Sequence, residues 1–562
     1  MKEELSIIIK NIINKLGYKI DNIQISNSTI YDYQCNDLFR IANIYHKNPL
    51  IIGEEIVNEI NKMEYFKEYF KEVTFTKPGF LNIMISDKFI NKYVKILYEN
   101  EKKLLNKQKK EIYVLDYGGA NVAKPLHVGH MRTAIVGESL KRIIKYMGNT
   151  VISDVHLGDF GLQIGEVIYG FLRDKLDIND IDINYLDKIY PEMSALVKVD
   201  EQTKEECAKI TKELQDGNQD YLKIWKKILD ISKQDIRKNY DYLDVSFDYW
   251  YGESDSYRYL NDVENILNNK KLLYLSENAY VVDVKENNDK KEIPPLLFKK
   301  SNGAYLYAST DLATILQRKI DFNPDHILYI VDNRQSLHFE QVFRTSDKAN
   351  IISKDKLEFL GYGTVNGKDG KPYKTRNGDT PKLENLFNNA KEIFINKKES
   401  NKEMKEEDIN KIVNAILKFA DLSNSRLKDY IFDLNKFSDV TGKTGPYILY
   451  TYLRINKILN STNNKNIEIN DTIYNEYDRE LRLKLLEAMD NIEIAYKERM
   501  PHYIADYVYK LSVSANIFYQ QNYVLNESDI TKKNNWIYVL TVTNKVIKLM
   551  LDLLVIDIPS MM

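Results

Sequence analysis

The sequence is poor in cysteine and has no strong net charge of either sign. Only two of its 562 residues are cysteines, Cys35 and Cys207, and they lie far apart. This excludes a disulfide framework and a cysteine metal cluster, and predicts two structural thiols in a reducing compartment. The 80 basic and 82 acidic residues leave a formal net charge of −2. A general electrostatic affinity for nucleic acid is therefore excluded, and any such surface must be a local patch.

Long uninterrupted apolar runs are also missing. The apolar stretch near the C-terminus, residues 539–558, is broken by two lysines and two aspartates. Charges at these positions favour a packed helix and oppose a membrane span. The first twenty residues contain acidic residues, and their apolar stretch is broken by Lys10, so we expect neither a signal peptide nor a span. The sequence predicts a cytoplasmic protein without a membrane partner.

The spacing of apolar residues divides the chain into parts with different periodicity. Residues 1 to about 85 predict a small α+β unit, with a helix over about 3–16 and a strand over 80–86. From residue 412 onward nearly everything is predicted to be helix. A charged stretch, residues 391–411, is expected to be a solvated helix face or connector.

Between these two parts, strands and helices alternate from residue 111 to about residue 387. A strand at 112–116, an amphipathic helix at 130–147 and a strand at 150–155 form a βαβ unit. This unit predicts a parallel sheet of the Rossmann type with a right-handed crossover. An insertion of long polar helices is expected at residues 185–243. Three later strands are expected at residues 279–284, 326–331 and 357–361.

The segment His127-Val-Gly-His130 lies between the first of these strands and the helix that follows it. Backbone N–H groups and the helix dipole converge on an anion at such a turn. Two imidazoles and Lys124 would suit a triphosphate that passes through a charged transition state. Gly119 and Gly129 allow the backbone to approach a ligand closely, and Gly129 would let a base or ribose lie against it.

Other interpretations of the two histidines remain open at this point. Each could cap the helix or be a satisfied, partly buried side chain. A zinc site is disfavoured because the sequence places no third ligand nearby. A Walker-type phosphate loop is not supported, because no GxxxxGK[ST] string follows the strand.

A resemblance to a known family extends these motifs over most of the chain. Residues 116–165, DYGGANVAKPLHVGHMRTAIVGESLKRIIKYMGNTVISDVHLGDFGLQIG, closely resemble the signature region of arginyl-tRNA synthetases, the class I aminoacyl-tRNA synthetases with a HIGH motif. Further similar strings are GESDSYRYL, GAYLYASTDLA, DNRQSLHFEQVF, KPYKTRNGDT and TGPYILYTYLRI.

The resemblance implies a multidomain fold with three parts. These are an N-terminal α+β domain that touches the tRNA elbow (residues 1–105), a Rossmann-type α/β catalytic domain with a helical insertion (106–390), and an all-α anticodon-binding domain (391–562). Aromatic side chains in the last part could stack on anticodon bases, but packing of the helical bundle is the better explanation for most of them. The protein is expected to act as a monomer.

The reaction that the resemblance implies begins with L-arginine and ATP, forms arginyl-adenylate and pyrophosphate, and ends with arginine on tRNA(Arg). Mg²⁺ would accompany ATP, held mostly by phosphates and water, with no protein metal site. Activation is implied to require tRNA. The resemblance assigns ATP binding to His127, Gly129, His130 and Lys374, and catalysis to His127, His130, Lys124 and Lys374.

Lys374 replaces a signature that is missing from this sequence. Class I enzymes carry a KMSKS loop, whereas this chain has Lys371-Pro-Tyr-Lys-Thr-Arg376 at the equivalent place. An exposed loop lysine is the alternative for Lys374. Lys124 is therefore expected to supply part of the missing positive charge.

Recognition of arginine needs a carboxylate and neutral acceptors around a planar guanidinium that offers five donors. Asp311 is the carboxylate that we choose, and the resemblance adds Tyr307 and Gln335. A helix N-cap is the alternative role for Asp311, because an apolar helical pattern follows it. The amino-acid end of arginine is implied to meet Gly119, Ala120, Asn121 and His130.

Two other functions remain possible. A synthetase-like paralogue could activate arginine for an acceptor other than tRNA, although such paralogues usually lose the tRNA-binding domains that this chain retains. A non-enzymatic tRNA-binding relative would predict a broken histidine motif or an altered Asp311 pocket, and the sequence shows neither.

Overall fold

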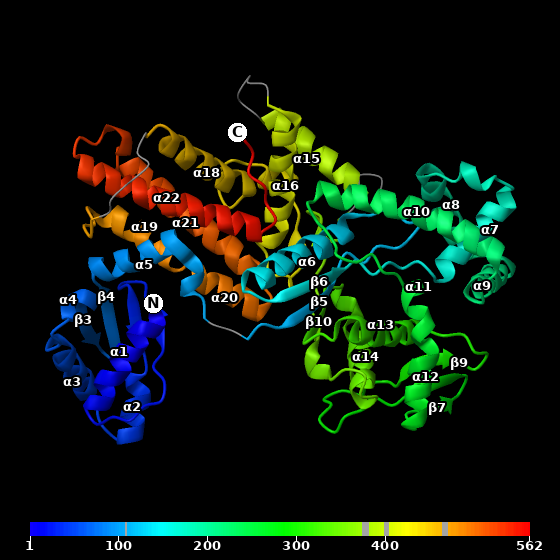
Figure 1. The fold of residues 1–562 in the computed structure, drawn as a ribbon, viewed down its shortest axis with the longest axis horizontal. Helices are drawn as coiled ribbons and strands as arrows, with labels where there is room; N and C mark the ends of the chain where they lie inside the picture. The colour runs from blue at the N-terminus through cyan, green and yellow to red at the C-terminus, as the bar shows by residue number, and fades with distance from the viewer. Residues whose placement is uncertain (107–108, 374–381, 398–403, 463–469) are drawn as a thin grey trace.

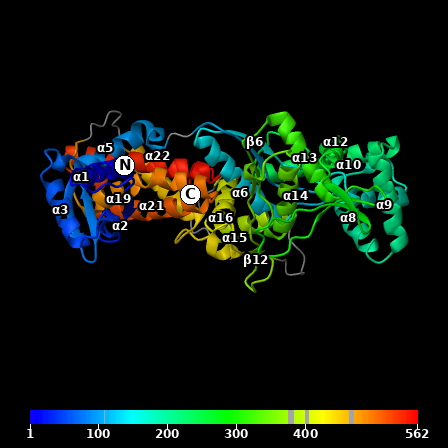
Figure 2. The same cartoon turned by 90° about the horizontal axis from the view of Figure 1, so that it is seen from below.

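The computed structural model describes residues 1–106, 109–373, 382–397, 404–462 and 470–562. The molecule is elongated, with the N-terminal unit at one end and the helices of residues 162–242 at the other (Figure 1). The view from below shows the same order along the long axis (Figure 2). The parallel sheet and the helical C-terminal region lie between the two ends.

The N-terminal unit combines an antiparallel sheet with helices, as predicted. Its strands follow the order β1-β2-β4-β3. Leu81, Ile83 and Ile85 alternate along β4 with no exposed surface, so this face of the strand forms the core. The elements are α1 Lys2–Lys15, β1 Ile25–Asn27, β2 Tyr33–Cys35, α2 Leu38–Tyr45, α3 Pro49–Asn61, α4 Phe66–Tyr69, β3 Phe70–Thr76, β4 Phe80–Ile85 and α5 Asp87–Asn100.

The central sheet is parallel and has the order β11-β10-β5-β6. The strands are β5 Ile112–Asp116, β6 Thr150–Asp154, β10 His326–Tyr329 and β11 Leu357–Phe359. Four of the five strands predicted between residues 111 and 387 form this sheet, and β5 has the predicted bounds. The predicted strand at 279–284 forms as β8 but belongs elsewhere, to a three-stranded antiparallel sheet with the order β7-β8-β9.

Two insertions separate β6 from β10 in the chain: the polar helices and the antiparallel sheet β7-β8-β9. The polar helical insertion forms as predicted, and the antiparallel sheet packs with α12, α13 and α14. The elements are α7 Leu162–Asp174, α8 Ile183–Leu196, α9 Glu201–Gln215, α10 Gln219–Tyr242, α11 Glu253–Ser256, α12 Leu260–Asn269, β7 Leu273–Ser276, β8 Ala279–Val282, β9 Leu296–Lys300, α13 Tyr307–Phe322 and α14 Ser336–Lys348.

Where the structure describes it, the C-terminal region is helical apart from the short strand β13, which pairs in parallel with β12. Helix α5 packs against α19 and α22, which joins the two ends of the chain in space. In the part of the chain that the structure describes, no helix is both long and apolar enough to cross a membrane. The elements are β12 Val365–Asn366, α15 Leu383–Lys397, α16 Glu406–Leu422, β13 Tyr430–Ile431, α17 Leu434–Phe437, α18 Gly445–Asn460, α19 Glu476–Leu486, α20 Ala488–Glu498, α21 His502–Gln521 and α22 Ile530–Leu553.

Helix α6, Val128–Tyr146, connects the sheet with the helical region. We predicted an amphipathic helix that begins at residue 130, and this prediction was wrong in two respects. The helix begins two residues earlier, and it is buried on nearly all sides, including Arg132, Ser139 and Lys141. The reason is that α16, α20 and α22 pack on the side that faces away from the sheet. The Ser139 hydroxyl even donates to the carbonyl of Leu553, the last residue of α22, at 2.7 Å.

Candidate functional site

The histidine segment follows β5 at the carboxyl edge of the parallel sheet. Asp116, the last residue of β5, pairs in register with Asp154 of β6 and with Tyr329 of β10. The chain leaves β5 toward β6 on one side and returns as β10 on the other. Loops that diverge in this way leave a crevice at the carboxyl ends of the strands, where open α/β sheets bind ligands.

His127 and His130 hold each other in place through the backbone. His127 is the N-cap of α6, and its Nδ1 accepts the Gly129 N–H at 3.1 Å. The His127 N–H in turn donates to Nδ1 of His130 at 3.1 Å. The two ring centroids lie 4.0 Å apart. Capping, one of the two readings open from the sequence, is therefore observed. Because both Nδ1 atoms accept hydrogen bonds, Nε2–H is the donor that each neutral ring has left.

Both imidazoles are uncharged at neutral pH. Burial, together with a smaller contribution from the charge of Lys124, lowers the pKa of His127 to about 4. Burial lowers the pKa of His130 to about 3, with smaller contributions from His127 and Lys124. An anion at this site would consequently meet neutral N–H donors and the helix N-terminus.

Gly129 is required by the ring of His127. A Cβ atom at Gly129 would lie 2.9 Å from Cε1 and 3.0 Å from Nδ1 of that ring. A side chain at this position would displace the capping imidazole. This finding adds a second reason for glycine to the predicted contact with a base or ribose.

Lys124 faces the helical insertion. Its Nζ lies 5.9 Å from the centre of the Tyr190 ring of α8, and among the described residues it makes no ion pair. Lys374 lies outside the described residues, so its role stays a prediction. On the two sides of that gap, the Tyr373 N–H donates to the Val365 carbonyl at 2.9 Å and Lys382 forms an isolated bridge with His127.

The predicted contacts for the amino-acid end lie on the loop between β5 and α6. Gly119 adopts a φ of +53°, and the Ala120 carbonyl accepts the Gly158 N–H at 3.0 Å. The Asn121 Oδ1 accepts from Nε2 of Gln163 at 3.3 Å. A Cβ atom at Gly158 would come within 2.2 Å of this Oδ1, so Asn121 needs glycine beside it. Gln163 thus orients Asn121, a role that sequence reasoning missed.

The predicted guanidinium pocket gathers around α13. Asp311 lies within this helix, whose N-cap is Leu306, so Asp311 is not the N-cap. Its Oδ2 lies 2.5 Å from Nε2 of His338 in α14. Tyr307 is one turn before Asp311, and Gln335 is one turn before His338, which places them on the same sides of the two helices. The structure therefore packs α13 against α14 through the Asp311–His338 contact, whereas Tyr307 and Gln335 are exposed and their contact with arginine stays a prediction.

Glu253 is a further acidic group of this neighbourhood that the sequence did not reveal. It is the first residue of α11, which packs against α13. Burial raises the pKa of Glu253 to about 7; the charges of Asp159 and Asp311 raise it and that of His156 lowers it. The only available signal was its place in the string GESDSYRYL.

Arg318 binds the carboxyl ends of two neighbouring strands of the parallel sheet, β5 and β6. Its guanidinium is 1% exposed and donates to Asp116 at 2.7 Å and to Asp154 at 3.0 Å. It thereby ties the carboxyl ends of β5 and β6 together. A sequence signal existed, because Arg318 follows the buried Ile315 by three residues on the same helix.

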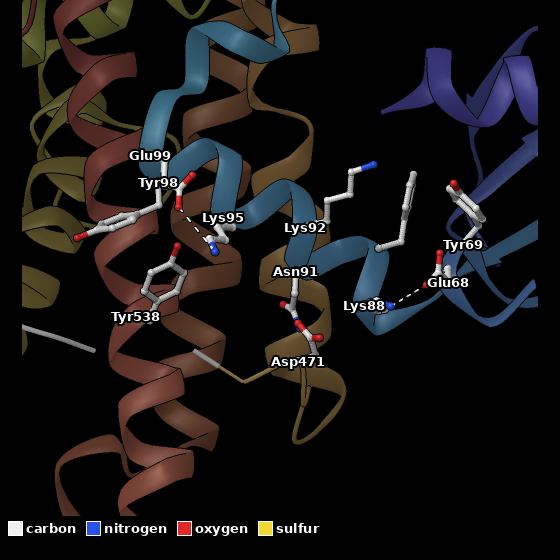
Figure 3. Close-up of a pocket in the computed structure, with 11 residues that line it drawn as sticks. Glu68, Tyr69, Lys88, Asn91, Lys92, Lys95, Tyr98, Glu99, Asp471 and Tyr538 are labelled. Carbon is white, nitrogen blue, oxygen red and sulfur yellow. Dashed lines mark hydrogen bonds and ion pairs between the residues drawn. The ribbon is translucent and has the colours of Figure 1, made fainter. Parts of the chain in front are cut away.

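A cavity of about 600 Å³ lies beside α5 and α22 (Figure 3), and neither His127 nor His130 is among the residues that line it. The rings of Tyr98 and Tyr538 lie 4.9 Å apart at its edge. Lys88 pairs with Glu68 at 2.8 Å, and the other lining lysines also face acidic partners. Because its charges cancel, the cavity does not resemble a phosphate site.

Comparisons with known proteins agree along the whole chain. The family models match as follows: tRNA synthetases class I (R), catalytic domain, residues 92–434; arginyl tRNA synthetase N terminal domain, residues 3–85; DALR anticodon binding domain, residues 448–562. The arginine–tRNA ligase of Alkaliphilus oremlandii is 39% identical over 586 residues and covers 100% of this chain and 99% of its own. That of Agathobacter rectalis is 40% identical over 582 residues, 97% of each chain.

Solved structures give the same result. Arginyl-tRNA synthetase from Plasmodium falciparum superposes with a TM-score of 0.80 at 25% identity, covering 100% of this chain and 99% of its own. The Thermus thermophilus enzyme has the same fold, with a TM-score of 0.82 at 19% identity and full coverage of both chains. With a catalytic-domain match over more than half of its length and relatives of about 39% identity end to end, the chain belongs to the arginyl-tRNA synthetases, a family of class I aminoacyl-tRNA synthetases.

Proposed function

We propose that this protein activates L-arginine with ATP to give arginyl-adenylate and then transfers arginine to the 3′ end of tRNA(Arg). One observation carries the proposal: two neutral imidazoles lie at the start of α6, where they offer donors to a phosphate, and carboxylates on α11 and α13 offer acceptors to a guanidinium. The membership of the family supports the same reading.

In the first step, an oxygen of the arginine carboxylate attacks the α-phosphorus of ATP. The new C(O)–O–P bond forms as the P–O bond to pyrophosphate breaks, and pyrophosphate leaves. The chain supplies position and electrostatic stabilisation, with no protein nucleophile. His127 and His130 would donate through Nε2–H to phosphate oxygens as their charge grows, and Lys124 would add a cation; Lys374 is assigned to the same task by its sequence alone.

The arginine side chain would lie between α11, α13 and α14. Asp311 and Glu253 offer carboxylates to its planar donors, and Tyr307 and Gln335 offer neutral acceptors. Lysine, ornithine and citrulline would leave some of these acceptors without partners, which is how a hydrogen-bonding pocket rejects close analogues. At the other end of the substrate, Asn121 and the backbone of Gly119 and Ala120 would meet the amino-acid group.

Magnesium would arrive with ATP. Among the described residues no group of three or more histidine, cysteine or acidic side chains is arranged to hold a metal ion. Such an ion would take phosphate oxygens and water as ligands, and its contribution would be to neutralise phosphate charge.

The remaining parts of the proposal concern tRNA and the state of the protein. The N-terminal unit would touch the tRNA elbow and the helical C-terminal region the anticodon, with boundaries near residues 105 and 390. We further propose a cytoplasmic monomer. Cys35 and Cys207 are both buried and unpaired, which suits a reducing compartment. Size-exclusion chromatography with light scattering measures the assembly state directly.

Arginine-dependent ATP–pyrophosphate exchange, measured with and without tRNA(Arg), tests the proposal together with arginine charging. We expect exchange that depends on tRNA, and stable charging of tRNA(Arg). Exchange without any charging would favour a paralogue that serves another acceptor. Absence of both reactions in the folded protein would contradict the proposal.

A further inference from the structure

Arg132 stands five residues after His127 on α6 and is 1% exposed, yet it does not face the proposed ligands. Its Nη1 donates to the carbonyl of Gly363 at 2.6 Å and to that of Lys428 at 3.1 Å, and its Nη2 donates to the carbonyl of Ser425 at 3.3 Å. One guanidinium therefore bridges the histidine helix and two irregular segments that lie more than two hundred residues downstream.

The carboxylate of Asp421 and the ring of Tyr430 orient the Arg132 guanidinium. Asp421 of α16 places Oδ1 3.5 Å from the Arg132 Nε. The Tyr430 ring lies 5.1 Å from the guanidinium carbon, and its hydroxyl donates to the other oxygen of Asp421 at 3.1 Å. Burial raises the pKa of Asp421, and the Arg132 guanidinium and the Tyr430 hydroxyl reduce this rise without cancelling it. The guanidinium is thus held on its edge and on its face.

The first segment that Arg132 holds leads to the arginine pocket. The Tyr362 N–H donates to the Val331 carbonyl, and the Tyr362 carbonyl accepts the Asn333 N–H, both at 3.0 Å. Asn333 opens the short turn that ends at Gln335, one of the proposed guanidinium contacts. Gly363 directly follows Tyr362, so Arg132 grips the backbone beside this turn.

The second segment leads to the strand pair β12–β13. The Lys428 carbonyl lies next to Asp429, whose Oδ1 accepts the Thr364 N–H at 2.6 Å. A Cβ atom at Gly363 would come within 2.5 Å of that same Oδ1 and 2.7 Å of the Lys428 carbonyl carbon. The two segments are in direct contact at the point where Arg132 reaches them.

We propose that Arg132 is a positioning residue for adenylate formation: it sets the distance between the imidazoles at the start of α6 and the backbone that carries the arginine pocket. This inference rests on the proposed function. A lysine cannot replace it, because a single ammonium lacks the planar fork that reaches carbonyls on two segments at once. Loss of this fork shifts the two half-sites relative to one another without removing any group that touches substrate.

The matched control is Arg482 of α19, which is equally buried and contacts no proposed ligand. It donates to Asp478 at 2.7 Å, to Asn91 at 2.5 Å and to Asn535 at 3.0 Å. Arg132→Lys and Arg482→Lys are made in the full chain, and melting temperature, kcat and both KM values are measured by pyrophosphate exchange. Both should melt earlier. At a temperature where both are folded, we expect kcat to fall by roughly 10²-fold in Arg132→Lys alone, as for a 1 Å misplacement.

Equal kcat values for the two folded variants would overturn the proposal, since a purely stabilising residue affects the amount of folded protein and not its turnover. If Arg132→Lys does not fold, Asp421→Asn replaces it, with Asp478→Asn as its control. Asp421→Asn should lower kcat by about tenfold through a loosened guanidinium, and an unchanged kcat would equally refute the idea. An inactive wild-type protein would instead refute the proposed function.

Discussion

The two halves of the proposed site handle charge in opposite ways. The phosphate half, at the start of α6, offers uncharged imidazoles that backbone hydrogen bonds lock in place. The arginine half, on α11, α13 and α14, holds ionisable groups that interact electrostatically. The pKa of Glu253 is about 7, and Asp311 is paired with His338. The anionic substrate thus meets preset dipoles, whereas the cationic substrate meets groups that can change protonation.

The largest effect is expected from removing a phosphate donor. His127→Ala should raise the barrier to adenylate formation by about 2.7–4 kcal/mol, as for the loss of one preorganised oxyanion donor. The fall should appear in kcat of pyrophosphate exchange. His127→Asn is the control for capping, because asparagine is a good N-cap but lacks the distal N–H. It should restore the melting temperature and not the rate; restored exchange in His127→Asn would mean that capping is the whole role.

Breaking the arginine half should affect a different parameter. Asp311→Asn removes the charge opposite the guanidinium while it keeps the shape of the side chain. We expect kcat/KM for arginine to fall by an amount that corresponds to roughly 1.5–3 kcal/mol of lost transition-state stabilisation, the usual contribution of a hydrogen bond to a charged group. ATP binding should persist. Wild-type kinetic constants for arginine would contradict the assignment.

Gly129→Ala tests whether adenylate formation depends on the observed position of the His127 ring. The added methyl group collides with the His127 ring and should displace it from the cap, at a cost of roughly 0.5–2 kcal/mol. A moderate fall in kcat with an unchanged KM for arginine is the expected pattern. If kcat is unchanged, the ring does not need its observed position.

The smallest effect is expected from pH, and it should separate the two halves. Glu253 is protonated below about pH 7, so the KM for arginine should fall several-fold as pH rises from about 6 to 8. Burial lowers the pKa of His338, but its hydrogen bond with Asp311 and the Asp311 charge outweigh burial and leave the pKa raised. When His338 loses its proton as pH rises, its positive charge no longer neutralises Asp311. This change also lowers the KM for arginine.

In contrast, kcat should show no inflection in this range from His127 and His130, because their pKa values lie near 4 and 3. Initial rates over a series of arginine concentrations and pH values provide the measurement. Glu253→Gln should flatten the dependence of KM. A pH-independent KM in the wild-type protein would show that the arginine half does not titrate.

Much of the fold could be predicted from local sequence patterns. The alternation of β4 and the apolar run of β5 identify buried strands regardless of their partners. Helix α6 could not be placed as well, because histidine is an unusual N-cap and because the elements that bury its polar side are encoded more than 250 residues later. Strands β7 and β9 were missed, since their exposed residues weaken the alternating pattern.

The residues of the site also divide into those that a local sequence pattern reveals and those that depend on distant contacts. His127, His130 and Gly129 are adjacent in sequence, so their spacing reveals them directly. Glu253, His338 and Arg132 act through contacts with segments 27 to more than 200 residues away, and such contacts leave no local pattern. The resemblance to a family supplied Tyr307 and Gln335, which no periodicity would have identified.

The hydrogen bond from Ser139 to the Leu553 carbonyl has a consequence for the synthesis of the chain. Helix α6 leaves the ribosome early, but α22, the last of the helices that cover it, ends roughly 400 residues later, about 20–80 s at ordinary elongation rates. During this interval, Arg132 lacks its partner Asp421 in α16 and Ser139 lacks its partner Leu553 in α22, so the nascent chain holds an uncovered core helix. Chaperone occupancy of ribosome-bound chains should therefore persist over residues 128–146 until the C-terminal helices emerge.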